Sequence, residues 1–377
     1  MLARRDDGKA VFIPYAVPGD KLLVQSFAEK KNYIRAEILE ILTAGTGRIK
    51  PACQYFGKCG GCNWQQIEYS RQVEAKRRIL EELFHHRFPE TKHLAITMQP
   101  CPMYFGYRSR VRLRRHVGDK IAVGFFRAGS HIVEDIEYCP LLRPRLNEIL
   151  PALRPISFHD EYNDIQEIDI ACSEKDVVWS TAKGGGKPGK LLQRKVGEFT
   201  YNVVAGAFFQ ANDFMIDALV SHVMDCTPQN SGNAIDLFSG AGLFSLPLAR
   251  RFSAVTAVEY SRMSHKLCEM NANAAGIKNI EAVCADVAGW LNLRKAPRFD
   301  CIVLDPPRTG ADTGVMEQID RLSPATIVYV SCNPQTLVRD LERLNIDCWR
   351  IVSVAGFDMF PQTHHFETVV HLHKWTQ

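Results

Sequence analysis

Short apolar runs that end at acidic residues, glycine or proline recur along the last half of the chain. One begins at Ala234, and others span residues 254–258, 301–304 and 325–330. Such runs, rich in Val and Ile, predict buried strands. The pattern therefore predicts that residues 201–377 form an α/β domain built on a Rossmann-like sheet.

The first 48 residues instead alternate apolar and polar positions over short stretches. Residues 10–14, 21–25 and 33–41 are three of these, and a Pro-Gly-Asp turn at 18–20 separates the first two. Short alternating strands predict a small β-barrel of the oligonucleotide-binding kind. A strand before Gly8 would be missing or very short, so a truncated barrel is one expectation. Direct RNA contact and a purely supporting role both stay open.

Arginine recurs at every second position in a stretch that reads as a strand, residues 107–115. The four arginines of this repeat are Arg108, Arg110, Arg112 and Arg114. In a strand this period places them on one face, which is costly unless a phosphate backbone lies across them. A solvated basic face is the alternative. Because residues 71–130 hold thirteen Lys and Arg against five Asp and Glu, we expect residues 49–200 to form an RNA-binding domain.

Three cysteines lie close together at the start of that central region. Cys53, Cys59 and Cys62 have the spacing Cys-x5-Cys-x2-Cys, and Cys139 is a plausible fourth ligand. Four thiolates suit either tetrahedral zinc or a [4Fe-4S] cluster. The spacing departs from the paired Cys-x2-Cys of most zinc sites and favours iron–sulfur, with structural zinc as the alternative.

Composition narrows the class of protein. The chain has 377 residues, of which 46% are hydrophobic and 23% charged, as in water-soluble proteins with two or three domains. No apolar run approaches the roughly 20 residues that cross a bilayer, and the first residues do not resemble a signal peptide. Twelve cysteines in such a chain favour a cytoplasmic location, where cysteines serve as metal ligands or catalysts.

Nucleotide-binding features follow the strands of the last domain in order. Gly240-Ala241-Gly242 comes after the first strand, and Glu259 ends the next one. Glycines let the backbone approach a ligand, and a carboxylate at that place binds ribose hydroxyls. The loop lacks the full Gly-x-Gly-x-x-Gly pattern, which favours S-adenosylmethionine over a dinucleotide. Asp286 follows the third strand and could accept from an adenine amino group.

Cys332 follows the strand 325–330, at the rim where α/β folds place their chemistry. A cysteine there is more often a packed small residue than a nucleophile. The neighbouring motifs change this interpretation, since Asp305-Pro306-Pro307-Arg308 ends the fourth strand and Glu367 begins another apolar run.

Together these motifs resemble the RNA 5-methyluridine methyltransferases, in particular the iron–sulfur-containing 23S rRNA (uracil-5-)-methyltransferases. The resemblance rests on the cysteine spacing and on five further segments, namely Phe208–Asn212, Asp236–Gly240, Asp305–Arg308, Ser331–Pro334 and His365–Val369. It implies a TRAM-like barrel over residues 1–48, an iron–sulfur and RNA-binding α+β domain over 49–200, and a catalytic domain over 201–377. It favours 23S ribosomal RNA as the substrate, with the T-loop of tRNA second, and a monomer.

The resemblance also assigns roles to residues. Cys332 would be the nucleophile and Glu367 the base. The S-adenosylmethionine contacts would be Gln210, Phe238, Glu259, Asp305 and, as a fifth, Asp286. The [4Fe-4S] ligands would be Cys53, Cys59, Cys62 and Cys139.

The expected chemistry follows from the poor nucleophilicity of uracil C5. Attack of the Cys332 thiolate on C6 makes C5 an enolate carbon that can accept a methyl group. A base must then remove the C5 proton, and partial burial would raise the pKa of Glu367 as that step requires. We expect a cation such as Arg308, or the cofactor sulfonium, to lower the pKa of Cys332.

Two other functions are weighed against this one. An amine N-methyltransferase also uses an Asp-Pro-Pro turn, but it follows the prolines with an aromatic residue where this chain has Arg308. A non-catalytic, metal-bearing RNA-binding protein predicts loss of Cys332, Glu367 or Gln210, and all three are present. The sequence therefore favours the uridine C5-methyltransferase.

Overall fold

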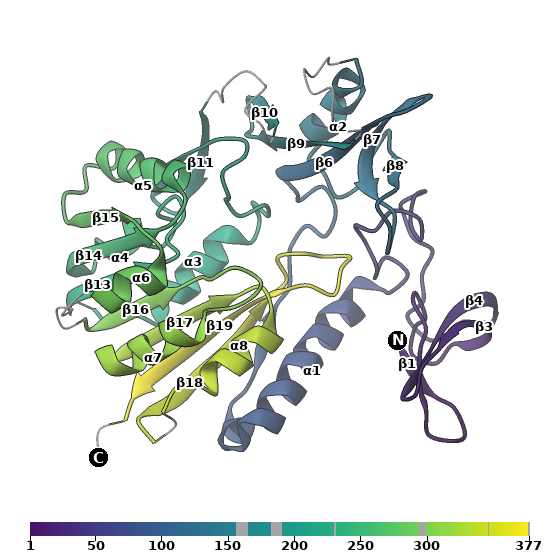
Figure 1. Cartoon of the computed structure of the whole chain (residues 1–377), viewed down its shortest axis with the longest axis horizontal. Helices are drawn as coiled ribbons and strands as arrows, with labels where there is room; N and C mark the ends of the chain where they lie inside the picture. The colour runs from purple at the N-terminus through teal and green to yellow at the C-terminus, as the bar shows by residue number, and fades with distance from the viewer. Residues whose placement is uncertain (156–164, 182–190, 230, 294–298, 346, 376–377) are drawn as a thin grey trace.

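The computed structural model describes residues 1–155, 165–181, 191–229, 231–293, 299–345 and 347–375. They form an eight-stranded sheet, a five-stranded sheet, a four-stranded sheet and a hairpin (Figure 1). Among these residues, none of the helices has the length and apolar character needed to cross a membrane.

The eight-stranded sheet is the centre of the C-terminal half. Its strands are β5 (Thr97–Gln99), β13 (Ser231–Leu237), β14 (Phe252–Glu259), β15 (Ile280–Cys284), β16 (Cys301–Leu304), β17 (Thr326–Ser331), β18 (Trp349–Phe357) and β19 (Glu367–Lys374). They lie in the order β15-β14-β13-β16-β17-β19-β18-β5. The first five are parallel to one another, whereas β19 runs antiparallel to both β17 and β18. The α/β fold expected from the apolar runs is confirmed.

Helices cover both faces of this sheet, which explains why its central strands are apolar throughout. One face is covered by α1 (Tyr69–Arg87), α6 (Val287–Leu293), α7 (Thr313–Leu322) and α8 (Pro334–Leu341). The other face is covered by α3 (Ile216–Asp225), α4 (Ser245–Leu248) and α5 (Arg262–Ala274). Neighbouring residues alternate between the faces, so Ile302 packs with the first set and Cys301 with the second.

Two elements of the predicted central domain belong instead to the core of the eight-stranded sheet. Leu80 and Phe84 of α1 are buried in the same cluster as Met98 of β5, and β5 pairs with β18. Figure 1 shows α1 running beside α8. The apolar side chains of α1 therefore pack this helix against the eight-stranded sheet. The basic residues of α1 do not form a continuous surface, because Lys76 is buried.

The five-stranded sheet lies in the order β10-β9-β6-β7-β8. Its strands are β6 (Arg110–Val117), β7 (Ile121–Phe126), β8 (Val133–Asp135), β9 (Ile165–Cys172) and β10 (Val177–Thr181). Leucines of α2 (Pro144–Ile149) and of the 3-10 turn η2 (Leu150–Leu153) cover one face. A second 3-10 turn, η1 (Pro89–His93), follows α1, and the hairpin of β11 (Leu192–Val196) and β12 (Phe199–Val203) leads to the C-terminal half.

The N-terminal sheet is small and has the order β1-β2-β4-β3. Its strands are β1 (Leu2–Arg4), β2 (Ala10–Phe12), β3 (Lys21–Glu29) and β4 (Tyr33–Thr43). A very short strand before Gly8 is thus present, as expected. Its hydrophobic cluster has few buried members, namely Ile13, Ala16 and Ala36.

Candidate active site

Side chains from three strands meet at one rim of the eight-stranded sheet. Cys332 follows the last residue of β17, and Asp305 follows the last residue of the neighbouring strand β16. Because β19 is antiparallel to β17, with Thr368 opposite Ser331, its first residue Glu367 begins where β17 ends. The register of β19 therefore brings Glu367 to the end of β17, beside Cys332, and the charges of both Glu367 and Asp305 act on this thiol.

The Cys332 thiol does not have the lowered pKa that the sequence predicts. Burial and the neighbouring carboxylates of Glu367 and Asp305 raise its pKa to about 11, although the Arg308 guanidinium acts in the opposite direction. Desolvation disfavours the thiolate, and one cation does not offset it here. A second positive charge beside the sulfur would be needed to make the thiolate available near neutral pH.

Glu367 is buried, with only 3% of its surface exposed. Burial and the adjacent Asp305 raise the pKa of the Glu367 carboxyl well above its ordinary value. Burial of the Asp305 carboxyl likewise raises its pKa to about 7. The raised pKa of Glu367 agrees with the expectation from its apolar strand, and it gives this carboxylate a high affinity for a proton.

Arg308 is fixed beside these groups by its own turn. Its carbonyl accepts from Asn333 Nδ2 at 3.2 Å and from Thr336 Oγ1 at 3.3 Å, both at the start of α8. Its guanidinium lies 2.8 Å from a ring nitrogen of His365. Sequence reasoning missed His365, although its position two residues before Glu367 was a signal.

The loop after β13 turns through left-handed backbone conformations. Phe238 has a φ of 62° and Gly240 a φ of 56°, which a glycine adopts without strain. Glu259, at the end of β14, accepts from the N–H of Gly240 at 2.9 Å and of Ser261 at 2.7 Å. The glutamate therefore fixes the loop, with one N–H bond to each of its carboxylate oxygens.

A buried acid beneath this loop was not singled out from the sequence. Asp236 is fully buried and accepts from Ser245 Oγ at 2.5 Å. Burial raises its pKa to about 7, with Asp305 and Glu259 adding to the effect. Its place in the Asp-Leu-Phe-Ser-Gly motif was the available signal.

The remaining two predicted cofactor residues lie in different surroundings. Asp286 is exposed and accepts from the N–H of Gly289 at 2.8 Å, in the first turn of α6. Gln210 is buried, with 3% exposed, on the segment between β12 and α3.

The four cysteines of the predicted cluster are gathered in one place. Burial raises the pKa of Cys59 to about 11 and of Cys62 to about 12, and each also responds to Cys53 and Cys139. The N–H of Gly61 donates to Cys59 Sγ at 3.4 Å. A thiol that is buried and accepts an N–H bond fits a metal-bound thiolate.

Their arrangement is nevertheless not that of a formed metal site. Across the described part of the chain, no group of three or more His, Cys, Asp or Glu side chains is arranged so that it could hold a metal ion. Close packing explains the glycine at position 60 without an inorganic centre. The N–H of Gly60 donates to the carbonyl of Phe126 at 2.9 Å, and a Cβ at this position would lie 3.0 Å from that oxygen. The predicted cluster is therefore not supported by the geometry.

The arginine repeat has partners within the protein that the sequence did not reveal. Arg112 pairs with Asp169 at 2.9 Å, and Arg114 pairs with Glu167, both on the adjacent strand β9. Arg110 donates to the carbonyls of residues 207 and 209, and Arg108 donates to the carbonyl of Arg110. The like charges are thus compensated without a bound phosphate, and Arg110 has a structural role.

Comparisons with known proteins show which family this chain resembles. Residues 190–288 and 291–375 match the family described as tRNA (Uracil-5-)-methyltransferase. An uncharacterized RNA methyltransferase of Thermotoga maritima is 33% identical over 99% of this chain and 96% of its own. The 23S rRNA (uracil(1939)-C(5))-methyltransferase of Shewanella sediminis is 30% identical over 96% of this chain and 90% of its own.

A solved structure has the same fold along almost the whole chain. The tRNA (uracil-54, C5)-methyltransferase of Pyrococcus abyssi, in complex with S-adenosyl-L-homocysteine, gives a TM-score of 0.75 at 23% identity and covers 98% of both chains. The expected mixed α/β methyltransferase fold is therefore confirmed. The chain belongs to the family of S-adenosylmethionine-dependent RNA (uracil-5-)-methyltransferases.

Proposed function

We propose that this enzyme methylates C5 of a uridine in 23S ribosomal RNA. The observation that carries the proposal is the placement of Cys332, Asp305 and Glu367 at adjacent ends of β17, β16 and β19, at one rim of the sheet. A thiol beside a buried carboxylate is what a Michael-type addition followed by proton removal requires. An amine methylation would leave Cys332 without a role.

In this mechanism Cys332 Sγ adds to C6 of the uracil ring. S-adenosylmethionine supplies the methyl group for C5 and, as a sulfonium, the second positive charge that favours the Cys332 thiolate. Glu367 takes the C5 proton, and the electrons of that C–H bond reform the C5–C6 double bond as the thiolate leaves. The residues that would hold the cofactor are Gln210, Phe238, Glu259, Asp286 and Asp305.

The choice of RNA rests on the relatives. The Shewanella sediminis protein, named as a 23S rRNA methyltransferase, is 30% identical to this chain. A tRNA (uracil(54)-C(5))-methyltransferase of Schizosaccharomyces pombe is 28% identical over 98% of this chain. The proposal is tested by incubating the enzyme with cofactor and either undermethylated 23S rRNA or tRNA, then measuring 5-methyluridine after nuclease digestion. Product in rRNA alone supports it, product in tRNA alone gives the tRNA function, and product in neither contradicts both.

We further propose that Cys53, Cys59, Cys62 and Cys139 hold a [4Fe-4S] cluster. The proposal is supported by the gathering of these four thiols and by the N–H bond to Cys59, and it requires them to shift when the cluster is inserted. Zinc, which needs a tighter tetrahedron of thiolates, is the weaker alternative.

Replacement of Cys59 by serine is expected to give colourless, poorly soluble protein. The cluster contributes folding energy in this proposal, because a site absent from the unfolded chain adds its binding energy to the native state. Iron per chain and visible absorbance after anaerobic purification are the measurements. Cys348→Ser, which lies elsewhere in the fold, is the control and should keep its iron. A soluble, active Cys59→Ser enzyme without iron would contradict the proposal that the cluster stabilises the fold.

RNA contact is proposed for the exposed end of the arginine face. Arg112, Arg114 and Arg127 line a hollow of about 530 Å³ together with Phe126 and His131. The pairing of these arginines with carboxylates leaves Arg112 half exposed. We propose that flanking phosphates of the RNA displace some of these pairs. The N-terminal sheet, as a shortened TRAM-like barrel, would extend this surface.

The double change Arg112→Ala with Arg114→Ala is therefore expected to weaken RNA binding about tenfold. A plot of log association constant against log salt concentration should also become less steep, by about one to two in the magnitude of its slope. Titration of a labelled RNA at several salt concentrations measures both quantities. Arg250→Ala removes an exposed arginine that pairs with Glu198 and is the control. Unchanged affinity and slope in the double variant would remove this face from the RNA interface.

A further inference from the structure

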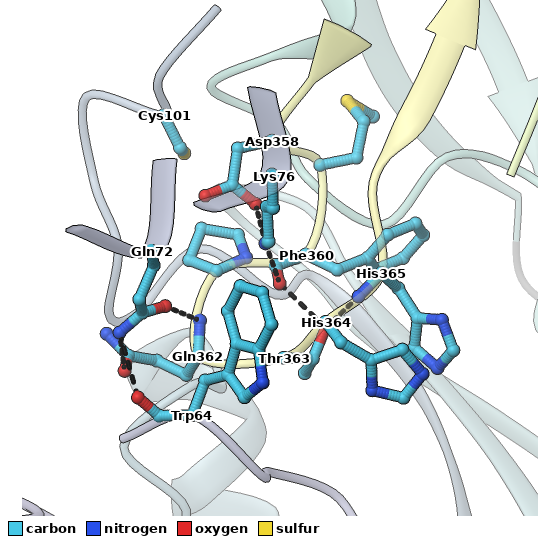
Figure 2. Close-up of polar contacts among 12 residues, drawn as sticks. Trp64, Gln72, Lys76, Cys101, Asp358, Phe360, Gln362, Thr363, His364 and His365 are labelled. Atoms are coloured by element: carbon cyan, nitrogen blue, oxygen red, sulfur yellow. Dashed lines mark hydrogen bonds and ion pairs between the residues drawn. The ribbon is translucent and has the colours of Figure 1, made fainter. Parts of the chain in front are cut away.

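The segment between β18 and Glu367, here called the 358–365 loop, is fastened by residues far from it in the sequence (Figure 2). Lys76 of α1 forms an ion pair with Asp358 at 2.6 Å and donates to the carbonyl of Phe360 at 3.2 Å. Both charged side chains of the pair are 0% exposed. Figure 2 shows Lys76 pointing from the helix into the loop.

A second residue of the same helix holds the middle of the loop. The N–H of Gln362 donates to Gln72 Oε1 at 3.0 Å, and Gln72 Nε2 donates to Gln362 Oε1 at 2.9 Å. Gln362 has a φ of 69°, a conformation that non-glycine residues rarely adopt. The loop is therefore kept by its contacts in a backbone shape that it would not adopt alone.

Three further contacts come from other parts of the chain. The backbone N–H of His364 donates to Asn63 Oδ1 at 3.0 Å. Tyr107 donates to the carbonyl of Pro361 at 3.2 Å. Asn212, two residues after Gln210, donates to the carbonyl of residue 359 at 3.1 Å. The loop thus touches the cysteine segment, the start of the five-stranded sheet and the segment that carries Gln210.

The end of the loop contacts the catalytic groups. Phe366 alone separates His365 from Glu367, and His365 lies 2.8 Å from the guanidinium of Arg308. A buried ion pair is costly to desolvate and adds little to stability compared with apolar residues of similar size. Unlike an apolar contact, the ion pair of Lys76 with Asp358 fixes the relative positions of its two groups, and so the position of the loop that leads to Glu367.

We propose that Lys76, Asp358 and Gln72 are positioning residues that hold Glu367 in place for removal of the C5 proton. The inference rests on the proposed function, since it names the step that these residues serve. Displacement of the loop moves Glu367 directly through the chain, whereas it acts on the five-stranded sheet and on the Gln210 segment through single hydrogen bonds from Tyr107 and Asn212. It should therefore slow the proton removal that releases Cys332 more than it weakens RNA binding.

The test is the double variant Lys76→Met with Asp358→Leu, which removes both charges and leaves neither unpaired. We expect kcat to fall about tenfold to a hundredfold, as for a small displacement of a reacting group, with the KM for RNA within about threefold. The methylated covalent adduct between Cys332 and ordinary uridine RNA should accumulate on a denaturing gel. Gln72→Met should change kcat and adduct in the same direction and serves as the second variant.

Arg87→Ala is the matched control, because it breaks the exposed pair of the same helix with Glu342, at 2.8 Å, and does not touch the loop. Wild-type kcat in a folded variant, or lost turnover without adduct, would overturn the inference. So would failure of both variants to fold, since the contacts would then serve folding alone. If the wild-type enzyme itself makes no 5-methyluridine, the proposed function fails instead.

Discussion

An enzyme in which Cys332 is replaced by alanine is expected to methylate RNA at no measurable rate while it still binds RNA and S-adenosylmethionine. Without a thiolate at C6, the C5 carbon of uracil is too weak a nucleophile to take the methyl group. We expect a loss of at least about 10⁴-fold in kcat, since loss of a covalent nucleophile is worth more than that in other enzymes. Transfer of labelled methyl to RNA, with filter binding of RNA, measures both properties.

Cys348→Ala is the control for this experiment. Cys348 is also a partly exposed cysteine next to a strand of the same sheet, but it precedes β18 and lies away from Cys332 in the chain. It should retain the wild-type rate. A Cys332→Ala enzyme that keeps even a tenth of wild-type activity would show that the thiol is a packed side chain.

The second large effect is expected from Glu367→Gln, which keeps the shape of the side chain and removes its basicity. Turnover should fall by about 10²–10⁴-fold, the usual contribution of a positioned base. Because Cys332 can still add to uracil, the covalent adduct should accumulate on ordinary RNA, in contrast to Cys332→Ala. A variant that is slow and forms no adduct would place Glu367 before the addition step.

The same variant has an expected effect on stability that depends on pH. The pKa of Glu367 in the folded protein is raised above its ordinary 4.5, so the native state holds this proton more tightly than the unfolded chain does. The associated stability is complete below pH 4.5 and is lost as pH rises through the folded pKa. Glu367→Gln should therefore gain in melting temperature relative to the wild type between pH 5 and pH 8. Parallel curves for the two proteins would contradict the raised pKa.

The rim chemistry could be predicted from the sequence because each group follows its own strand. Cys332, Asp305 and Glu259 all come directly at or after the end of an apolar run, and parallel strands bring such ends to one edge. The place of Glu367 needed the antiparallel register of β19, which a single sequence does not specify. The role expected for Glu367 therefore came from the resemblance to a known family, since the local pattern of residues did not indicate it.

Charge balance was the part that the sequence could not predict. The carboxylates of Glu167 and Asp169 meet the arginine repeat only through the pairing of β6 with β9, more than fifty residues away. Arg77 and Arg78 follow Lys76 in the sequence, and only tertiary packing buries Lys76 against Asp358. The pKa of Cys332 likewise depends on burial and on two carboxylates outside its own motif.

The most direct test of the covalent mechanism is a trap with RNA that contains 5-fluorouridine. Fluorine at C5 cannot be removed as a proton, so the bond between Cys332 and C6 should persist after methyl transfer. We predict a protein–RNA adduct on a denaturing gel that requires S-adenosylmethionine, whose modified peptide contains Cys332, and which Cys332→Ala does not form. No adduct from wild-type enzyme that binds both cofactor and RNA would contradict the covalent mechanism.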